Sequence, residues 1–305
     1  MTSTARSGSV SEISTPLTAT RRARADRRVE LAAFLRKARE RVTPADAGIA
    51  PGVRRKTPGL RREEVAQLAG VGITWYTWLE QGRPINVSIQ VLDAIARVLR
   101  MQSAERWYLY RLADVPGVPA PASPTPLPSD AVAVLDQLDP VPACIYNTKY
   151  DLQACNLSYA ALFPGLATAT GLRRNALWRL ANARPEDPTD LGRDAVATMI
   201  SNLRANYAQH VGDPEWVQLI DSITATSPEM ARIWADHQVT APRPMVKVFR
   251  REPVGIIELN TVSYAIEGVT EARMVIYLPR TAQDAERIHR LRAATEQQST
   301  SPRRD

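Results

Sequence analysis

The sequence of 305 residues has few of the residues that build disulfide frameworks and metal sites, with two cysteines and three histidines. Cys144 and Cys155 do not make a disulfide scaffold, and neither has Cys or His neighbours at the spacing of a metal site. If residues 147–151 turn a hairpin, the two thiols face each other across it. That leaves a redox switch open, but in a reducing cytosol we expect reduced core thiols. The sequence predicts no metal and no cofactor.

Long apolar runs are also missing. No run approaches the roughly 18 residues of a membrane-spanning helix, and the first twenty residues lack the apolar core of a secretory signal. We therefore expect a cytoplasmic protein, associated with the nucleoid, and no membrane partner. A Gly-rich phosphate loop, a nucleophile elbow and a metal motif are absent as well, which argues against an enzyme.

Acidic residues are scarce near the N-terminus. Residues 1–62 contain fifteen Lys/Arg and five Asp/Glu, a net charge of +10, whereas the rest of the chain sums to −3. Such asymmetry indicates an anionic polymer or a membrane surface as the partner of the basic segment. We expect residues 1–27 to form a disordered basic arm, which either embraces DNA or only solubilises the chain.

Residues 61–82 read RREEVAQLAGVGITWYTWLEQG and have the layout of two short amphipathic helices joined by a tight turn. Apolar residues recur at helical spacing, and the glycines of the sequence GVG at 70–72 break the first helix. The second helix, 73–81, is expected to bury Tyr76 and Leu79. This pattern also fits an ordinary helical hairpin, but the surrounding positive charge favours a helix-turn-helix DNA reader.

The expected DNA contacts are basic side chains flanking the motif and outward side chains of its second helix. A positive helix start preceded by a basic loop is suited to binding phosphates. The residues are Arg54, Arg55, Lys56, Arg61, Arg62, Ile73, Thr74, Trp75, Thr77, Trp78 and Arg83. Because an indole cannot make the bidentate hydrogen bonds that Arg makes to guanine, we expect apolar contacts from Trp78.

Six prolines and almost no charge mark residues 114–130 as a semi-extended linker. Before it, five helices predict an all-α domain at 28–113. After it, two strands, several helices and three strands predict an α+β domain at 131–280, with one antiparallel sheet and the helices on one side. A charged helix and a polar tail are expected at 281–305.

Residues 57–82, followed by VLDAIARVLRM, resemble the Cro/repressor-like (XRE-type) helix-turn-helix regulators, especially the subgroup with an MmyB-like ligand-binding domain. The segments LQACNLSYAALF, SPEMARIWADHQV and VGIIELN fit the same subgroup. The resemblance implies a PAS-like sensor fold, homodimeric binding to double-stranded operator DNA, and a small apolar or fatty-acid-like effector. It also implies that Ile73, Thr74 and Trp78 face bases and that Arg61 and Arg62 contact phosphates.

Four residues of the second domain are candidates for ligand binding: Asn156, Trp234, His237 and Lys247. In one interpretation, Trp234 lines an apolar cavity while His237 and Lys247 hold a carboxylate. In the other, His237 interacts with a helix dipole and Lys247 faces solvent. For Asn156 we favour a helix cap. The predicted function is a ligand-sensing DNA-binding transcriptional regulator; the alternative keeps DNA binding and makes the second domain only a dimerisation or partner-protein module.

Overall fold

The computed structural model of the chain describes residues 16–49, 59–115, 126–183, 189–190, 192–239 and 245–300. Its first part is all-α, as the sequence predicts. The helices are α1 (Pro16–Arg41), α2 (Arg62–Ala69), α3 (Ile73–Glu80), α4 (Ile89–Val98) and α5 (Ser103–Leu112). They enclose one apolar core, in which Leu35, Tyr76 and Leu92 are fully buried.

The turn after α3 is fixed by Gly82. Its φ is +71°, and a Cβ there would lie 2.8 Å from the carbonyl oxygen of Arg28. Any larger residue would therefore be strained and would push α3 away from α1. This close approach positions α3 on the surface of the helical domain.

Helix α1 begins earlier than expected. The sequence placed residues 1–27 in a disordered arm before the all-α domain at 28–113, but residues 16–27 are helical. Alanine and arginine are strong helix formers, and Asp114 lies 3.1 Å from the guanidinium of Arg27. The backbone of Gly212 also lies close to α1 at Ala23. The expected arm is therefore wrong for residues 16–27, and residues 1–15 lie outside the described part.

The second part is α+β with an antiparallel sheet, which confirms the predicted fold class. Its elements are α6 (Ser129–Leu138), β1 (Ala143–Asn147), β2 (Leu152–Cys155), α7 (Leu157–Leu162), α8 (Pro164–Ala167), the 3₁₀-helix η1 (Gly171–Arg174), α9 (Ala176–Ala181), β3 (Thr189–Asp190), α10 (Gly192–Tyr207), α11 (Pro214–Thr226), α12 (Pro228–Ala235), β4 (Met245–Arg251), β5 (Gly255–Ile266), β6 (Val269–Pro279) and α13 (Ala282–Thr300). The strands form one antiparallel sheet in the order β2-β1-β6-β5-β4-β3. Cys144 and Cys155 are direct neighbours across β1 and β2, as expected, and both are free thiols.

Helices cover both faces of the sheet, so the expectation of helices on one side is wrong. Successive residues of a strand point to opposite faces. Cys144 and Tyr146 pack with the cluster that contains α7 and α13, whereas Ala143 and Ile145 pack with Leu135 of α6 on the other face. Strand β1 is buried on both faces and therefore requires cover on both.

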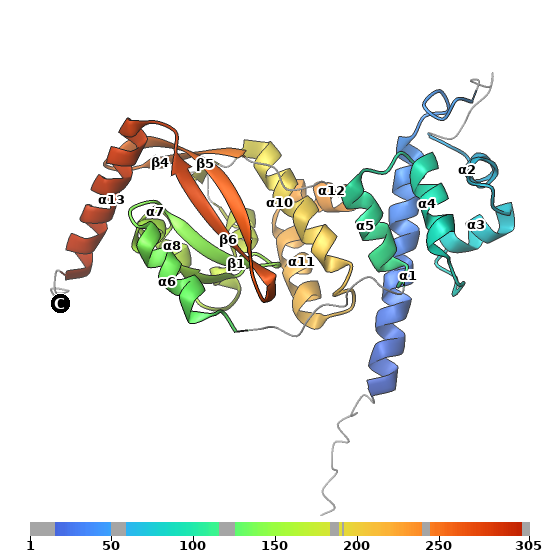
Figure 1. The fold of residues 1–305 in the computed structure, drawn as a ribbon, viewed down its shortest axis with the longest axis horizontal. Helices are drawn as coiled ribbons and strands as arrows, with labels where there is room; N and C mark the ends of the chain where they lie inside the picture. The colour runs from blue at the N-terminus through green and yellow to red at the C-terminus, as the bar shows by residue number, and fades with distance from the viewer. Residues whose placement is uncertain are drawn as a thin grey trace, which may run out of the picture.

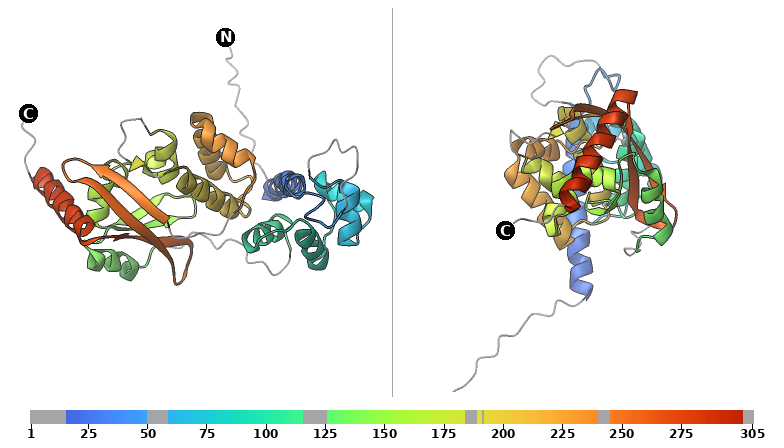
Figure 2. Two further views of the ribbon diagram at one scale, coloured as in Figure 1. Left: turned by 90° about the horizontal axis from the view of Figure 1, so that it is seen from above. Right: turned by 90° about the vertical axis from the view of Figure 1, so that its left-hand side faces the viewer.

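Helices α10, α11 and α12 lie between the sheet and the five-helix domain (Figures 1 and 2). Three buried residues from this side, Ala208, Val211 and Val239, belong to the same apolar cluster as the core of the five-helix domain. The two domains are therefore joined by a continuous apolar contact. Within the described residues, no helix combines the length and the apolar character needed to cross a membrane.

Candidate DNA-binding surface and ligand cavity

The outer side of α3 faces solvent. Ile73 and Trp78 are large apolar side chains that are nevertheless 47% and 39% exposed. Thr74 is exposed beside them, and the guanidinium of Arg83 lies 5.6 Å from the ring centre of Trp78. Arg61 is exposed at the start of α2. Ile73, Thr74 and Trp78 are thus exposed on α3, and Arg83 lies beside Trp78 just beyond the end of the helix, which is compatible with a DNA-reading helix.

The other predicted DNA contacts are placed differently. Trp75 and Thr77 are half-buried, and Trp75 packs against the core of the helical domain. The guanidinium of Arg62 is engaged with Glu80, with Nη2 2.9 Å from its carboxylate. Residues 54–56, which include the predicted contacts Arg54, Arg55 and Lys56, lie outside the described residues.

A buried charge cluster centred on Glu80 holds α2 and α3 to α1. The carboxylate of Glu80 accepts hydrogen bonds from Arg39 Nε and Nη2 at 2.7 and 2.8 Å. Burial alone raises the pKa of Glu80, but hydrogen bonding and the charges of Arg39 and Arg62 outweigh it and lower the pKa. Sequence reasoning missed Glu80, although its spacing from Tyr76 and Leu79 places it on the buried face of α3.

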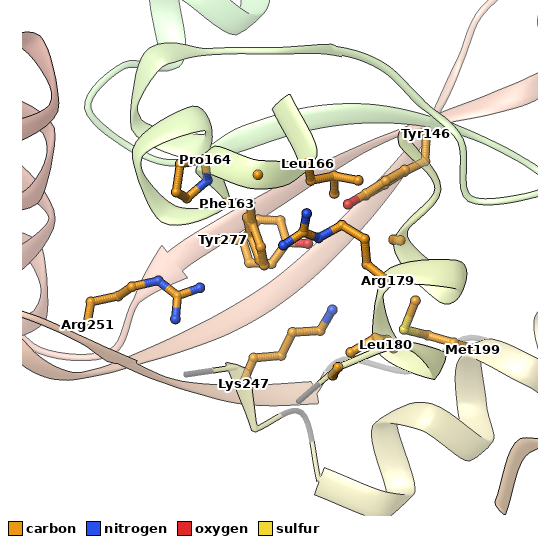
Figure 3. A pocket seen from close by; sticks show the side chains of 13 residues that line it. Tyr146, Phe163, Pro164, Leu166, Arg179, Leu180, Met199, Lys247, Arg251 and Tyr277 are labelled. Carbon is orange, nitrogen blue, oxygen red and sulfur yellow. The ribbon is translucent and has the colours of Figure 1, made fainter. Parts of the chain in front are cut away.

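A cavity of about 250 Å³ lies in the second domain (Figure 3). It is bounded by the sheet, α8, α9 and α10. Most of its walls are apolar or aromatic, with Tyr146, Phe163, Leu166, Leu180, Met199 and Tyr277 contributing. The cavity exceeds the ~150 Å³ that holds a benzene molecule in an engineered protein core. It is therefore large enough for part of an organic ligand.

Three cationic side chains also line the cavity, and two of them have no acceptor among the described residues. Lys247 is 9% exposed, and burial lowers its pKa to about 8. Its ammonium lies 5.3 Å from the ring centre of Tyr277, and Arg179 extends into the same space (Figure 3). Arg251, by contrast, donates two hydrogen bonds to the Leu162 carbonyl, at 2.9 and 2.7 Å, and so caps α7.

Of the four predicted ligand residues, only Lys247 lines this cavity. Asn156 caps α7, because its Oδ1 accepts from the backbone N–H of Tyr159 at 3.0 Å. The same oxygen accepts from Ala143 N–H, and its Nδ2 donates to Leu135 and Val141 carbonyls. The buried amide is thus fully used in joining α6, β1 and α7, in agreement with the role we favoured.

Trp234 and His237 lie at the contact between the domains. The indole of Trp234 stacks under the guanidinium of Arg204, 3.8 Å from the ring centre. Nδ1 of His237 lies 2.9 Å from Arg204 Nη1 and 3.3 Å from the carboxylate of Glu30 on α1. Arg204 is itself fully buried and paired with Glu30. The expected grouping of Trp234 and His237 with Lys247 is therefore wrong, since both pair with a buried ion pair.

Sequence reasoning missed the rest of the cavity, which short and dispersed segments supply. Phe163 and Leu166 come from the end of α7 and from α8, Arg179 from α9 and Met199 from α10. None of these carries a motif, and only the topology brings them together. In the part of the chain that the structure describes, no three His, Cys, Asp or Glu residues are arranged to hold a metal ion. The cavity is suited to binding an apolar molecule with an anionic group.

Comparison with known families gives two matches. A model described as the MmyB-like transcription regulator ligand binding domain matches residues 127–292, more than half of the chain. A helix-turn-helix domain model matches residues 30–109. The first match contains the cavity and the second contains α2 and α3, which confirms the resemblance inferred from the sequence. A comparison with curated proteins gave no match.

Proposed function

Because the chain belongs to the MmyB-like transcription regulators and carries a helix-turn-helix domain, we propose that it binds operator DNA through α3 and senses a small amphipathic anion, such as a fatty acid. One observation carries the choice of ligand: the buried ammonium of Lys247 has no carboxylate partner among the described residues and lies in a cavity whose walls are mostly apolar or aromatic. Burial of an unpaired charge is costly. A ligand carboxylate beside Lys247 offsets this cost, and its apolar chain fills the cavity.

The alternative, a second domain that serves only dimerisation or a partner protein, gives no reason for such a cavity. A buried cation without a counter-charge destabilises the empty protein, and a cavity forfeits packing contacts. Both costs are offset when a ligand binds. The geometry therefore favours a sensor over a purely structural module.

The test compares dodecanoate with dodecan-1-ol, which has the same chain length and no charge. Dodecanoate is expected to raise the melting temperature of the full chain more than the alcohol, because binding to the native state stabilises it. The variant Lys247→Met should remove this difference, whereas Lys37→Met, at an exposed lysine of α1, should retain it. Equal effects of acid and alcohol on the unmodified chain, or no effect of either, would contradict the proposal.

We further propose that the chain acts as a homodimer on a pseudo-palindromic operator. A single eight-residue α3 reads only a short half-site, and helix-turn-helix proteins join two such half-sites about one helical turn apart. Light scattering of the full chain, alone and with a two-half-site duplex, tests this proposal. A complex with one chain per duplex would refute it.

A further inference from the structure

A groove larger than the cavity lies between the second domain and the helical domain. Its volume is about 920 Å³, and it runs between α5, α10 and one end of the sheet. Helix α5 contributes Trp107, Tyr108 and Arg111 to its wall. Molecules bound in this groove therefore touch the DNA-binding part of the chain directly.

The groove and the cavity meet at one place. Tyr146, Met199 and Lys247 line both. Figure 3 shows Tyr146 and Met199 on the same side of the cavity. A ligand with charged atoms beside Lys247 can therefore extend into the cavity, into the groove, or into both.

The two hollows differ in chemistry. The cavity is mainly apolar, whereas the groove presents hydrogen-bonding side chains from the end of β1 and from α10, namely Asn147, Thr148, Asn202 and Asn206. Besides Lys247, it also presents two cations, Arg111 and Arg273. Among the described residues that line either hollow there is no aspartate or glutamate. The groove therefore favours a polar anionic group, and the cavity favours an apolar chain.

Helix α5 brings an incompletely paired cation into the groove. Nε of Arg111 is buried and has no hydrogen-bond partner, and its Nη1 makes one long contact of 3.5 Å with the Ala205 carbonyl. Its guanidinium lies 5.6 Å from the ring centre of Trp107, which is 52% exposed. A buried donor left without an acceptor is unfavourable, so an anionic ligand group near Arg111 is stabilised from the side of the helical domain.

We propose that the effector is an acyl chain joined to a large anionic head group, with the chain in the cavity and the head in the groove against α5. This inference rests on the proposed function, because it assumes that the cavity takes an apolar chain. It adds to a free fatty acid an anionic head group, and it adds the helical domain, through α5, to the parts of the chain that bind the ligand. The head then links α5 to the sensor domain, and the ligand itself couples its own binding to the position of the DNA-binding helices.

The experiment measures the affinity of the full chain for dodecanoate, for N-dodecanoyl-triglutamate, whose head carries carboxylates from the acyl amide outward, and for free triglutamate by isothermal titration. The acyl conjugate is expected to bind at least about tenfold more tightly than dodecanoate, since the head adds contacts. Trp107→Ala should remove most of this gain and leave dodecanoate affinity unchanged. Ile89→Ala truncates another exposed apolar side chain of the same domain, outside the groove, and should change neither affinity.

The outcomes separate the two proposals. Equal affinity of dodecanoate and its conjugate, or binding of dodecanoate alone, overturns the two-part ligand and leaves the fatty-acid sensor intact. A tighter conjugate whose advantage survives Trp107→Ala overturns the contact with α5. Failure of every acyl probe to bind overturns the proposed function itself.

Discussion

Lys247 is the residue on which the ligand proposal depends. Its partner across the sheet on β5 is Leu259, and the group whose charge favours its charged form is the thiol of Cys144. That thiol is itself buried, and burial raises its pKa well above the usual value, so it supplies little negative charge. The ammonium is therefore buried at a cost in solvation free energy, and perturbed groups of this kind are common at functional sites.

The burial of the Lys247 ammonium is expected to make the free energy of unfolding depend on pH. The pKa of Lys247 is about 8 in the folded chain and 10.5 in an exposed lysine, so between these values the unfolded state binds more protons. The free energy of unfolding is therefore expected to rise from pH 8 to pH 10.5 relative to Lys247→Met, and the penalty is fully present below pH 8. Urea unfolding of both proteins across this range measures it. Parallel curves would show that the ammonium is already paired.

At the scale of elements, α2 and α3 show which parts of the DNA-binding surface are free to act. Arg61 and Arg62 are adjacent in sequence and both were expected to contact phosphates. Arg61 is exposed, whereas Arg62 neutralises Glu80 together with Arg39. Substitution of Arg61 is therefore expected to affect DNA binding alone, whereas substitution of Arg62 is expected to affect stability as well.

Arg61→Ala is expected to weaken binding to every DNA sequence alike and to reduce the salt slope by about 0.9, the loss of one phosphate contact. The free energy of unfolding of Arg61→Ala should differ from that of the unmodified chain by less than about 0.5 kcal/mol, as for substitutions at other exposed positions. Arg62→Ala should in addition destabilise the chain by roughly 1–3 kcal/mol, because the carboxylate of Glu80 loses a charged donor. Fluorescence anisotropy at several salt concentrations and urea unfolding measure both effects. An unchanged salt slope in Arg61→Ala would exclude it from the interface.

Most elements could be predicted from the sequence, because periodicity and caps are local. Ser88, for example, caps α4 by accepting from Val91 N–H, as its position indicates. The extension of α1 could not, since contacts with Asp114 and Gly212 stabilise it from far along the chain. The same limit applies to the sites: Lys247 stands out in its strand, but Arg179 becomes a candidate only when the fold brings α9 over the sheet.

At the scale of the whole molecule, the two domains are held together by a buried ion pair. Glu30 of α1 pairs with Arg204 of α10, and Tyr108 of α5 donates a hydrogen bond of 2.6 Å to the same carboxylate. Trp234 and His237 enclose Arg204 from the side of the second domain. Arg204 is part of α10, so a displacement of α10 would disturb its ion pair with Glu30 of α1 and the hydrogen bond from Tyr108 of α5. This contact does not line the cavity, and it links α10 of the second domain to α1 and α5 of the helical domain.

The contribution of this ion pair is expected to depend on pH in the acid range. Burial raises the pKa of Glu30, but hydrogen bonds from His237 and Tyr108 and the charge of Arg204 outweigh it and lower the pKa to about 2. The stabilisation is therefore fully present above pH 4.5, the value of an exposed glutamate, and is lost as the pH falls towards 2. Glu30→Gln should cost roughly 3–5 kcal/mol at pH 7, because it leaves Arg204 buried and unpaired.

The difference in unfolding free energy between Glu30→Gln and the unmodified chain should shrink between pH 4.5 and pH 2, where the unmodified carboxyl also becomes neutral. The double variant Glu30→Gln/Arg204→Met is the matched control, since removing both charges avoids an unpaired one and should recover most of the loss. Urea unfolding of the unmodified chain and of both variants measures the three free energies of unfolding. A double variant as unstable as Glu30→Gln would show that packing between the domains, and not the unpaired charge, sets the cost.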